Sequence, residues 1–180
     1  MKIVGLTYLR GVSQMYVKPD VALLVNRKPF FLPHFSEQIE AHRCVVAKIS
    51  RMGRCIEARF ASRYYEEVAP ACNFMVRGLN ENTGLDSLTK GLAFDNSMAV
   101  GEFAKAGEMK LSWYADGVEL PGTDLAEGID NAVAEVSRYV TLRTGDMVAI
   151  DYKAEALPLQ REMVITAKSG DEELLYCKVK

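Results

Sequence analysis

Most apolar positions along this chain follow the short-range alternation of β-strands. Short apolar runs bounded by turn residues predict strands at residues 2–6, 21–25, 30–32, 43–49, 71–76, 109–115, 118–120, 163–167 and 174–179. Asp116-Gly117 is the signal of a two-residue hairpin turn. A second hairpin is predicted across residues 26–29, where Pro29 weakens the signal, and Ser169-Gly170-Asp171 is expected to join the last two strands.

Two stretches have the period of a helix instead. Residues 56–68 carry an apolar side chain at every fourth position with charged residues between them, and Pro70 is expected to end this helix. A second helix is predicted after the hairpin, with Asp124 and Glu127 at its N-terminal cap. Its apolar stripe consists of Ile129, Val133, Val136 and Val140.

The distribution of these elements indicates the fold class. Strands outnumber helices and cluster towards both ends of the chain, whereas residues 78–90 are polar and are predicted to form a loop. This arrangement favours a mainly β, α+β fold over a doubly wound sheet.

Composition narrows the class of protein. The 180 residues, 49% hydrophobic, suit one domain spanning residues 1–180, and the net charge of −2 does not favour nucleic acid as a partner. The N-terminus lacks the layout of a signal peptide, and no apolar run approaches the roughly 20 residues that span a bilayer. We therefore expect a cytoplasmic protein without a membrane partner.

Cysteine and histidine usage limits the candidate chemistry. None of the four cysteines forms a CxxC pair, so we interpret them as small hydrophobic residues in a reducing cytoplasm. His34 and His42 are the two histidines, and any histidine chemistry must use one of them.

Six motifs follow one another over nearly the whole chain. They are KPDVALL at 18–24, EAHRCVV at 40–46, RMGR at 51–54 with Tyr64-Tyr65, KGLAFD at 90–95 with Val100-Gly101, Asp116-Gly117 with Gly122-Thr123, and TLRTGD at 141–146. In this order they resemble the fumarylacetoacetate hydrolase family. The resemblance implies a twisted, multi-layered mixed β-sheet fold with few helices, similar to that family's C-terminal domain, and assembly as a dimer or larger.

The resemblance also implies a reaction type. Family members hold a divalent cation with carboxylates, and the cation polarises a bound 2-oxo or diketo acid for C–C hydrolysis, decarboxylation or isomerisation. In this chain Glu40 stands at the first carboxylate position, His42 at the second and Asn73 at the third. Glu40 and His42 share one strand face, because side chains at i and i+2 point the same way.

This donor set carries two negative charges fewer than three carboxylates would. Magnesium prefers oxygen ligands, so its affinity should fall, and mixed nitrogen and oxygen donors favour zinc. We therefore expect no bound cofactor, with Mg²⁺, Mn²⁺ or Zn²⁺ as the alternative. In the plainer interpretation, Glu40 and His42 only form hydrogen bonds.

Other family positions are altered as well. Gly5-Leu6-Thr7-Tyr8 replaces a "GRNY" motif, which makes Tyr8 a substrate-binding candidate, and residues 9–14 lack the histidine of the family's acid/base segment. Residues 150–153 replace the family's carboxylate-binding loop, where Asp151 would repel an anion.

Three further candidates come from the retained motifs. By resemblance, Lys90 faces the cleft as a catalytic residue, and Asp95 and Arg77 contact the substrate. A guanidinium can hold a carboxylate through two hydrogen bonds. Each also has a structural interpretation, as a surface lysine, a loop aspartate or a brace for a dimer.

Three functions remain open. In the first, the chain is a catalytically impaired homologue with a cleft for a small carboxylic or 2-oxo acid. In the second, it is an active metal-dependent hydrolase, decarboxylase or isomerase that uses His42 in a rebuilt site. In the third, it is a structural protein that acts through its dimer surface. Changes at the metal positions, the acid/base segment and the carboxylate loop together favour the first. We expect a dimer in solution, a homodimer or a mixed dimer with an active relative.

Overall fold

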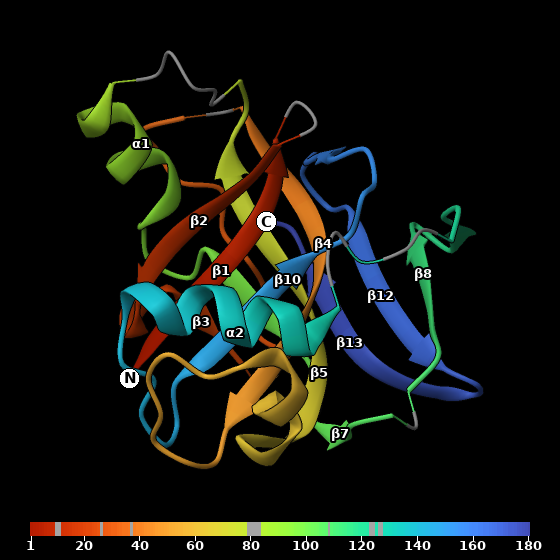
Figure 1. Cartoon of the computed structure of the whole chain (residues 1–180). Helices are drawn as coiled ribbons and strands as arrows, with labels where there is room; N and C mark the ends of the chain where they lie inside the picture. Colours follow the sequence, from red (N-terminus) through yellow and green to blue (C-terminus); the bar gives the residue numbers. More distant parts are fainter. Residues whose placement is uncertain are drawn as a thin grey trace.

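The computed structural model of the chain describes residues 1–9, 12–25, 27–36, 38–78, 84–107, 109–122, 125 and 128–180. Within these residues the strands form a nine-stranded and a four-stranded sheet (Figure 1). The elements in chain order are β1 (Lys2–Leu9), β2 (Val12–Pro19), the 3-10 helix η1 (Asp20–Ala22), β3 (Leu23–Leu24), β4 (Ile39–Ile49), the 3-10 helix η2 (Ala58–Arg63), β5 (Tyr65–Val76), α1 (Leu85–Leu92), β6 (Met98–Val100), β7 (Ala104–Lys105), β8 (Leu111–Ala115), β9 (Val118–Glu119), α2 (Ile129–Tyr139), β10 (Met147–Asp151), β11 (Leu157–Pro158), β12 (Val164–Ser169) and β13 (Glu172–Lys178).

The larger sheet is mixed. Its strand order is β2-β1-β10-β4-β5-β6-β3, with β11 beside β4 and β7 beside β5. The pairs β1–β10 and β3–β6 are parallel and the others are antiparallel. The smaller sheet is antiparallel in the order β13-β12-β8-β9. The predicted mainly β, α+β fold with a mixed sheet is confirmed.

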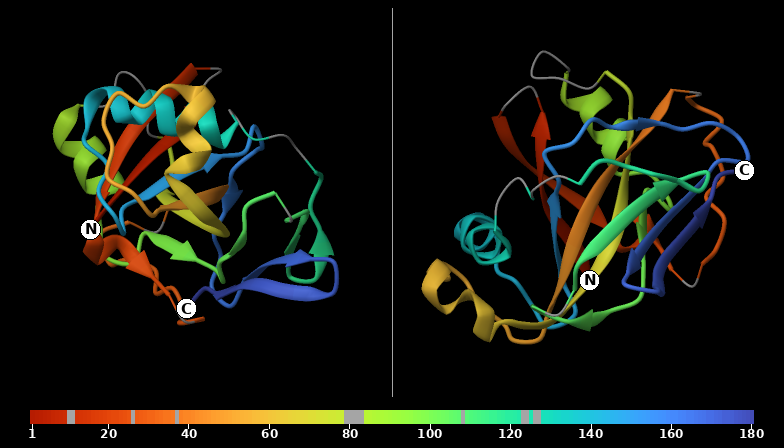
Figure 2. Two further views of the ribbon diagram at one scale, coloured as in Figure 1. Left: turned by 60° about the horizontal axis from the view of Figure 1, so that its bottom comes forward. Right: turned by 90° about the vertical axis from the view of Figure 1, so that its right-hand side faces the viewer.

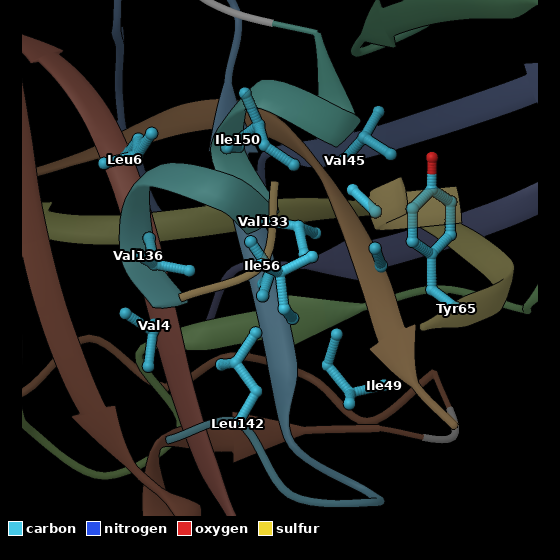
Figure 3. Packing of buried hydrophobic residues seen from close by; sticks show 14 of the residues in the cluster. Val4, Leu6, Val45, Ile49, Ile56, Tyr65, Val133, Val136, Leu142 and Ile150 are labelled. Atoms are coloured by element: carbon cyan, nitrogen blue, oxygen red, sulfur yellow. The ribbon is translucent and has the colours of Figure 1, made fainter. Parts of the chain in front are cut away.

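One face of the larger sheet is covered by α2 and by the smaller sheet (Figures 1 and 2). Figure 3 shows Val133 and Val136 of α2 packing towards Val4, Leu6 and other residues of this face. A second cluster on the same face joins Ile39, Ala41 and Phe74 to residues of the smaller sheet, namely Trp113, Ile165, Ala167, Leu175 and Cys177. The opposite face has its own apolar cluster near Ile3, Val46 and Met98.

Several predicted elements are confirmed. The strands predicted at 2–6, 43–49 and 71–76 are the longer β1, β4 and β5, and the C-terminal pair is β12 and β13. The hairpin of β8 and β9 turns at Asp116 (φ 49°) and Gly117 (φ 79°), the two positive values that a type I′ turn requires. The second helix is α2, and its predicted cap residues 124 and 127 lie outside the described residues.

The helix predicted at residues 56–68 is wrong. The chain forms only η2 and then enters β5 at Tyr65, yet Ile56, Tyr65 and Val68 all pack into one core cluster. Ile56 and Val68 of the predicted stripe thus face one core from a turn and a strand, whereas Phe60 lies outside that cluster against Arg59 and Arg63. Pro70 lies inside β5, between the residues paired with β7 and those paired with β6. The Pro70 carbonyl accepts the backbone N–H of Gly101 at 2.9 Å, on the edge of β5 that faces β6 and β7. The N–H that proline lacks would point to this same edge, so no hydrogen bond to β4 is lost.

The N-terminal hairpin prediction is also wrong. The short β3 pairs with β6, and Phe30 instead donates its backbone N–H to Lys178 O at 2.8 Å. Residues 85–92 form α1 where a loop was predicted. Both differences arise from long-range packing, which local residue patterns do not report. None of the helices among the described residues is long and apolar enough to cross a bilayer.

The TLRTGD motif forms a tight turn before β10. Gly145 adopts φ 87°, and the Asp146 carboxylate accepts the backbone N–H of Arg143 at 2.8 Å and forms an ion pair with Lys2. These contacts join the starts of β1 and β10, whose side chains approach one another further along the sheet.

Candidate functional site

Strand alternation brings the three predicted metal positions together. Glu40 and His42 lie on β4, and Asn73 is the direct cross-strand partner of His42 on β5. β10 pairs with the other edge of β4, where Asp151 lies opposite Cys44 and adds a second carboxylate to the same face. This face also carries Thr7 of β1 and Tyr16 of β2. We call Thr7, Tyr16, Glu40, His42, Asn73 and Asp151 the polar cluster.

The imidazole of His42 lies between two carboxylates. Its Nε2 is 3.0 Å from Glu40 Oε1, and its Nδ1 is 4.0 Å from Asp151 Oδ2. Asn73 Nδ2 donates to the same Asp151 oxygen at 3.5 Å. Asn73 and Asp151 are fully buried, and His42 is 8% exposed.

This geometry does not fit a metal ion held at the predicted positions. Both ring nitrogens of His42 face carboxylates of the chain itself. Among the described residues no group of three His, Cys, Asp or Glu side chains is arranged to hold a metal. As arranged, Glu40 and His42 form a hydrogen-bonded network.

Asp151 is the most strongly perturbed acid of the cluster. Burial raises the pKa of its carboxyl group to about 6, although His42, Thr7, Asn73 and Lys18 each lower it. Below about pH 6 the group is therefore neutral and can donate a hydrogen bond, whereas at neutral pH it carries a negative charge inside the protein. Sequence analysis predicted the charge of this residue but not its burial.

Four buried atoms of the polar cluster make no hydrogen bond with described residues. They are Thr7 Oγ1, Tyr16 Oη, Asn73 Oδ1 and Asp151 Oδ1. Burial raises the pKa of Tyr16, so its phenol stays neutral and remains a donor. Buried polar atoms in native proteins are usually paired, so these four can take water or a polar ligand group.

A cavity of about 260 Å³ is lined by Thr7 and Tyr16, the residues that carry two of these atoms. It lies between the β1–β2 hairpin and α1, with Thr7 and Tyr16 on one side and Leu85, Leu88 and Leu92 of α1 on the other. A ligand with one polar end and a short apolar body matches this lining.

Lys18 is a buried residue to which sequence analysis assigned no role. Its Nζ donates to the carbonyls of Phe74 (3.0 Å), Leu92 (2.6 Å) and Ser97 (3.1 Å), and to Ser97 Oγ at 2.9 Å. Burial lowers the pKa of Lys18 to about 7. Its four oxygen acceptors favour the ammonium form, because a neutral amine has only two N–H donors. Lys18 thus links β2 to β5 and to the end of α1, and the KPDVALL motif was the signal that could have indicated it.

The remaining predicted residues lie outside the polar cluster. Lys90 is exposed on α1 and pairs with Asp86 at 2.7 Å, and Asp95 is exposed in a turn. Arg77 is exposed at the end of β5, and Tyr8, 36% exposed, lies under the Lys153 ammonium group at 5.3 Å. Their predicted catalytic and substrate-binding roles stay predictions.

Comparisons with known proteins show a shared fold at low sequence identity. No protein-family model matches the chain, and no curated protein matches it. A Yersinia pestis CO92 structure assigned to the fumarylacetoacetate hydrolase family superposes with a TM-score of 0.84 at 19% identity, covering 99% of this chain and 92% of that one. An Escherichia coli structure assigned as an isomerase gives 0.84 at 22% identity, covering 99% and 91%.

A third structure was solved with ligands. It is fumarylpyruvate hydrolase from Pseudomonas aeruginosa in complex with Mn²⁺ and pyruvate, with a TM-score of 0.81 at 21% identity and coverage of 99% of this chain and 88% of that one. All three similarities extend over almost the whole of this chain. The chain therefore has the fold of the fumarylacetoacetate hydrolase family, as its ordered motifs predict.

Proposed function

We propose that residues 1–180 form a single-domain homologue of the fumarylacetoacetate hydrolase family that binds a small carboxylic or 2-oxo acid but is catalytically impaired. The observation that carries this proposal is the position of His42 between Glu40 and Asp151, 3.0 and 4.0 Å from their oxygens. An imidazole in this position contacts the same carboxylates that a bound cation would need as ligands.

The small carboxylic or 2-oxo acid would bind in the cavity of about 260 Å³ beside α1. Thr7 and Tyr16 line the cavity, and neither hydroxyl makes a well-aligned hydrogen bond, although Thr7 lies near Asp151 and Tyr16 near Asn73. Both hydroxyls can therefore turn to donate to a carboxylate. The leucines of α1 can cover the apolar part of the ligand. Ionised Asp151 opposes an anion, so binding should strengthen as the pH falls through about 6.

One observation favours an active enzyme as the second candidate. Asp151 places a carboxylate beside Glu40 and His42, and its Oδ1 has no partner among the described residues. A rotation of His42 could turn Glu40, His42 and Asp151 towards one ion, which would then be Mn²⁺ or Zn²⁺ because the donors mix nitrogen and oxygen. This would give a rebuilt hydrolase, decarboxylase or isomerase.

Calorimetry separates the two candidates. Titration with Mg²⁺ and Mn²⁺ should give no saturable heat below about 1 mM, whereas pyruvate should bind. Tyr16→Phe should weaken pyruvate binding about tenfold, because a hydrogen bond to a charged group is lost. Tyr176→Phe, on β13 of the smaller sheet, is the matched control because it removes a phenol hydroxyl elsewhere and keeps Tyr16.

Turnover assays with acylpyruvates, oxaloacetate and related diketo acids should stay at background. Micromolar Mn²⁺ binding that is lost in Asp151→Asn, or a rate that disappears in His42→Ala, would establish the second candidate. The absence of pyruvate binding at both about pH 5.5 and about pH 7.5 would refute the acid-binding proposal.

The cellular location also remains a proposal. Cys44, Cys72 and Cys177 are buried and Cys55 is exposed, and all four are free thiols. Free buried thiols suit the reducing cytoplasm that the sequence predicts.

A further inference from the structure

β4 and β10 present polar side chains on both faces of the larger sheet. Arg43 follows His42, and Tyr152 follows Asp151, so strand alternation turns both away from the polar cluster. The backbone N–H of Tyr152 donates to Arg43 O at 2.9 Å, which holds these two residues side by side. They lie on the face covered by the smaller sheet, where Trp113 of β8 contacts the Tyr152 ring edge-on at 6.1 Å between centroids.

Arg43 is buried without a countercharge. It is 5% exposed, and its Nη1 donates to Pro121 O at 3.0 Å. Its Nε has no acceptor, and no carboxylate of the described residues forms an ion pair with it. A buried charge is costly unless it is paired. A negatively charged partner would therefore stabilise the guanidinium group.

A second buried donor points to the same place. Trp113 is 3% exposed, and its indole N–H makes no well-aligned hydrogen bond. The Tyr152 hydroxyl lies near the indole, which lowers the Tyr152 pKa that burial raises. The N–H groups of Arg43 and Trp113 are both donors, so neither can satisfy the other. The neutral Tyr152 hydroxyl can accept a hydrogen bond but carries no charge, so it cannot supply the countercharge for Arg43.

Both side chains line a cavity of about 80 Å³ beneath the β8–β9 hairpin. Ser112, Glu119 and Tyr152 supply its other polar side chains, and Leu111 and Leu120 are apolar. One water molecule occupies about 30 Å³ in the liquid, so the space suits a group of a few heavy atoms.

We propose that this cavity binds a small monocarboxylate of the size of formate or acetate, which pairs with Arg43 and accepts the indole N–H of Trp113. The site is separate from the polar cluster and does not depend on the function proposed for it. Glu119, on the exposed β9, is the one acidic side chain in the lining, and its charge opposes the anion.

Trp113 is the only tryptophan in the chain, so its fluorescence reports on the site directly. Formate and acetate are titrated up to about 100 mM at constant ionic strength, with the bulky anion 4-morpholineethanesulfonate as the balancing ion because it has several times as many heavy atoms as acetate. We expect a saturable change in Trp113 emission for both acids. Glu119→Gln, which removes the like charge, should bind several-fold more tightly.

Substitution of the arginine tests the charge pairing. Arg43→Met should weaken binding at least tenfold, while Arg138→Met, an exposed arginine of α2 paired with Glu135, should bind as the wild type does. If Arg43→Met does not fold, the binding affinity of Glu119→Gln still tests the proposal. A wild-type emission that does not change saturably, or Glu119→Gln that binds no more tightly, would overturn the proposal and leave water as the occupant.

Discussion

Asp151 is a buried group whose charge lowers the stability of the protein at neutral pH. Burial raises its pKa to about 6 from the ordinary value of 3.8. Between these values the native state binds a proton that the unfolded state has released. The free energy of unfolding therefore falls as the pH rises from about 4 to about 6, and it stays reduced above that range.

Removing this charge should stabilise the protein at pH 7. In Asp151→Asn, the free energy of unfolding should exceed that of the wild type by up to about 3 kcal/mol, since one pKa unit corresponds to about 1.4 kcal/mol. The introduced amide can also donate to the unpaired Asn73 Oδ1. Urea denaturation at about pH 4 and pH 7 measures both proteins. A stability difference that is the same at both pH values would contradict the raised pKa.

Lys18 should show the opposite sensitivity to substitution. Lys18→Met leaves the carbonyls of Phe74, Leu92 and Ser97 without their donor and should cost about 3 to 5 kcal/mol of unfolding free energy. The matched control is Lys48→Met, because Lys48 is half-exposed and pairs with Glu67 at 3.3 Å. The control should change stability by less than about 1 kcal/mol. Equal losses in the two variants would exclude a special role for Lys18.

At the scale of elements, β5 is the strand on which the architecture depends. It pairs with β4 along one edge and with β7 and β6 along the other, and between these two short strands the carbonyl of Pro70 accepts the backbone N–H of Gly101. Glu102 N then donates to Leu174 O at 2.7 Å, so this short segment connects β5 with β13 of the smaller sheet.

A methyl group at Gly101 should disturb this connection. A Cβ there would overlap the carbonyl oxygen of Leu174, which belongs to a strand backbone and cannot move aside easily. Gly101→Ala should therefore lower the free energy of unfolding by about 1 to 3 kcal/mol. Gly122→Ala is the control, since nothing lies near its Cβ position, and it should stay within about 0.5 kcal/mol of the wild type. A Gly101→Ala variant as stable as the control would show that the two sheets are not tightly joined here.

At the scale of the whole molecule, the open edge of the larger sheet bears on assembly. β2 ends the strand order, and Val12 and Val17 on it are 58% and 46% exposed. An unpaired edge with apolar side chains is a surface on which another chain can pack.

We predict a homodimer at micromolar concentration. A stable dimer of this kind typically buries over about 2,000 Å² with an apolar centre. Light scattering should report twice the 20.0 kDa of one chain. Val17→Lys places a charge on β2 and should weaken the dimer if this edge takes part, whereas Lys90→Met on α1 serves as an exposed control. A mass of one chain throughout the micromolar range would refute the prediction.

Local patterns in the sequence were sufficient for several features. Alternation and turn residues predicted the strands around β4, β5, β12 and β13, the Asp116-Gly117 hairpin and the apolar stripe of α2. The i, i+2 spacing also predicted that Glu40 and His42 share one face. These features depend on residues close together in the chain, where side-chain direction follows directly from backbone period.

Only the tertiary structure decided which distant residues meet. Asn73 and Asp151 are 78 positions apart, and their contact requires β4 to lie between β5 and β10. The same long-range pairing buries Lys18, turns Arg43 into an internal cavity and replaces the predicted helix at 56–68 with η2 and β5. A residue pattern shows which side of an element is apolar. Which other element packs against that side depends on the packing of the whole chain, and local sequence does not determine it.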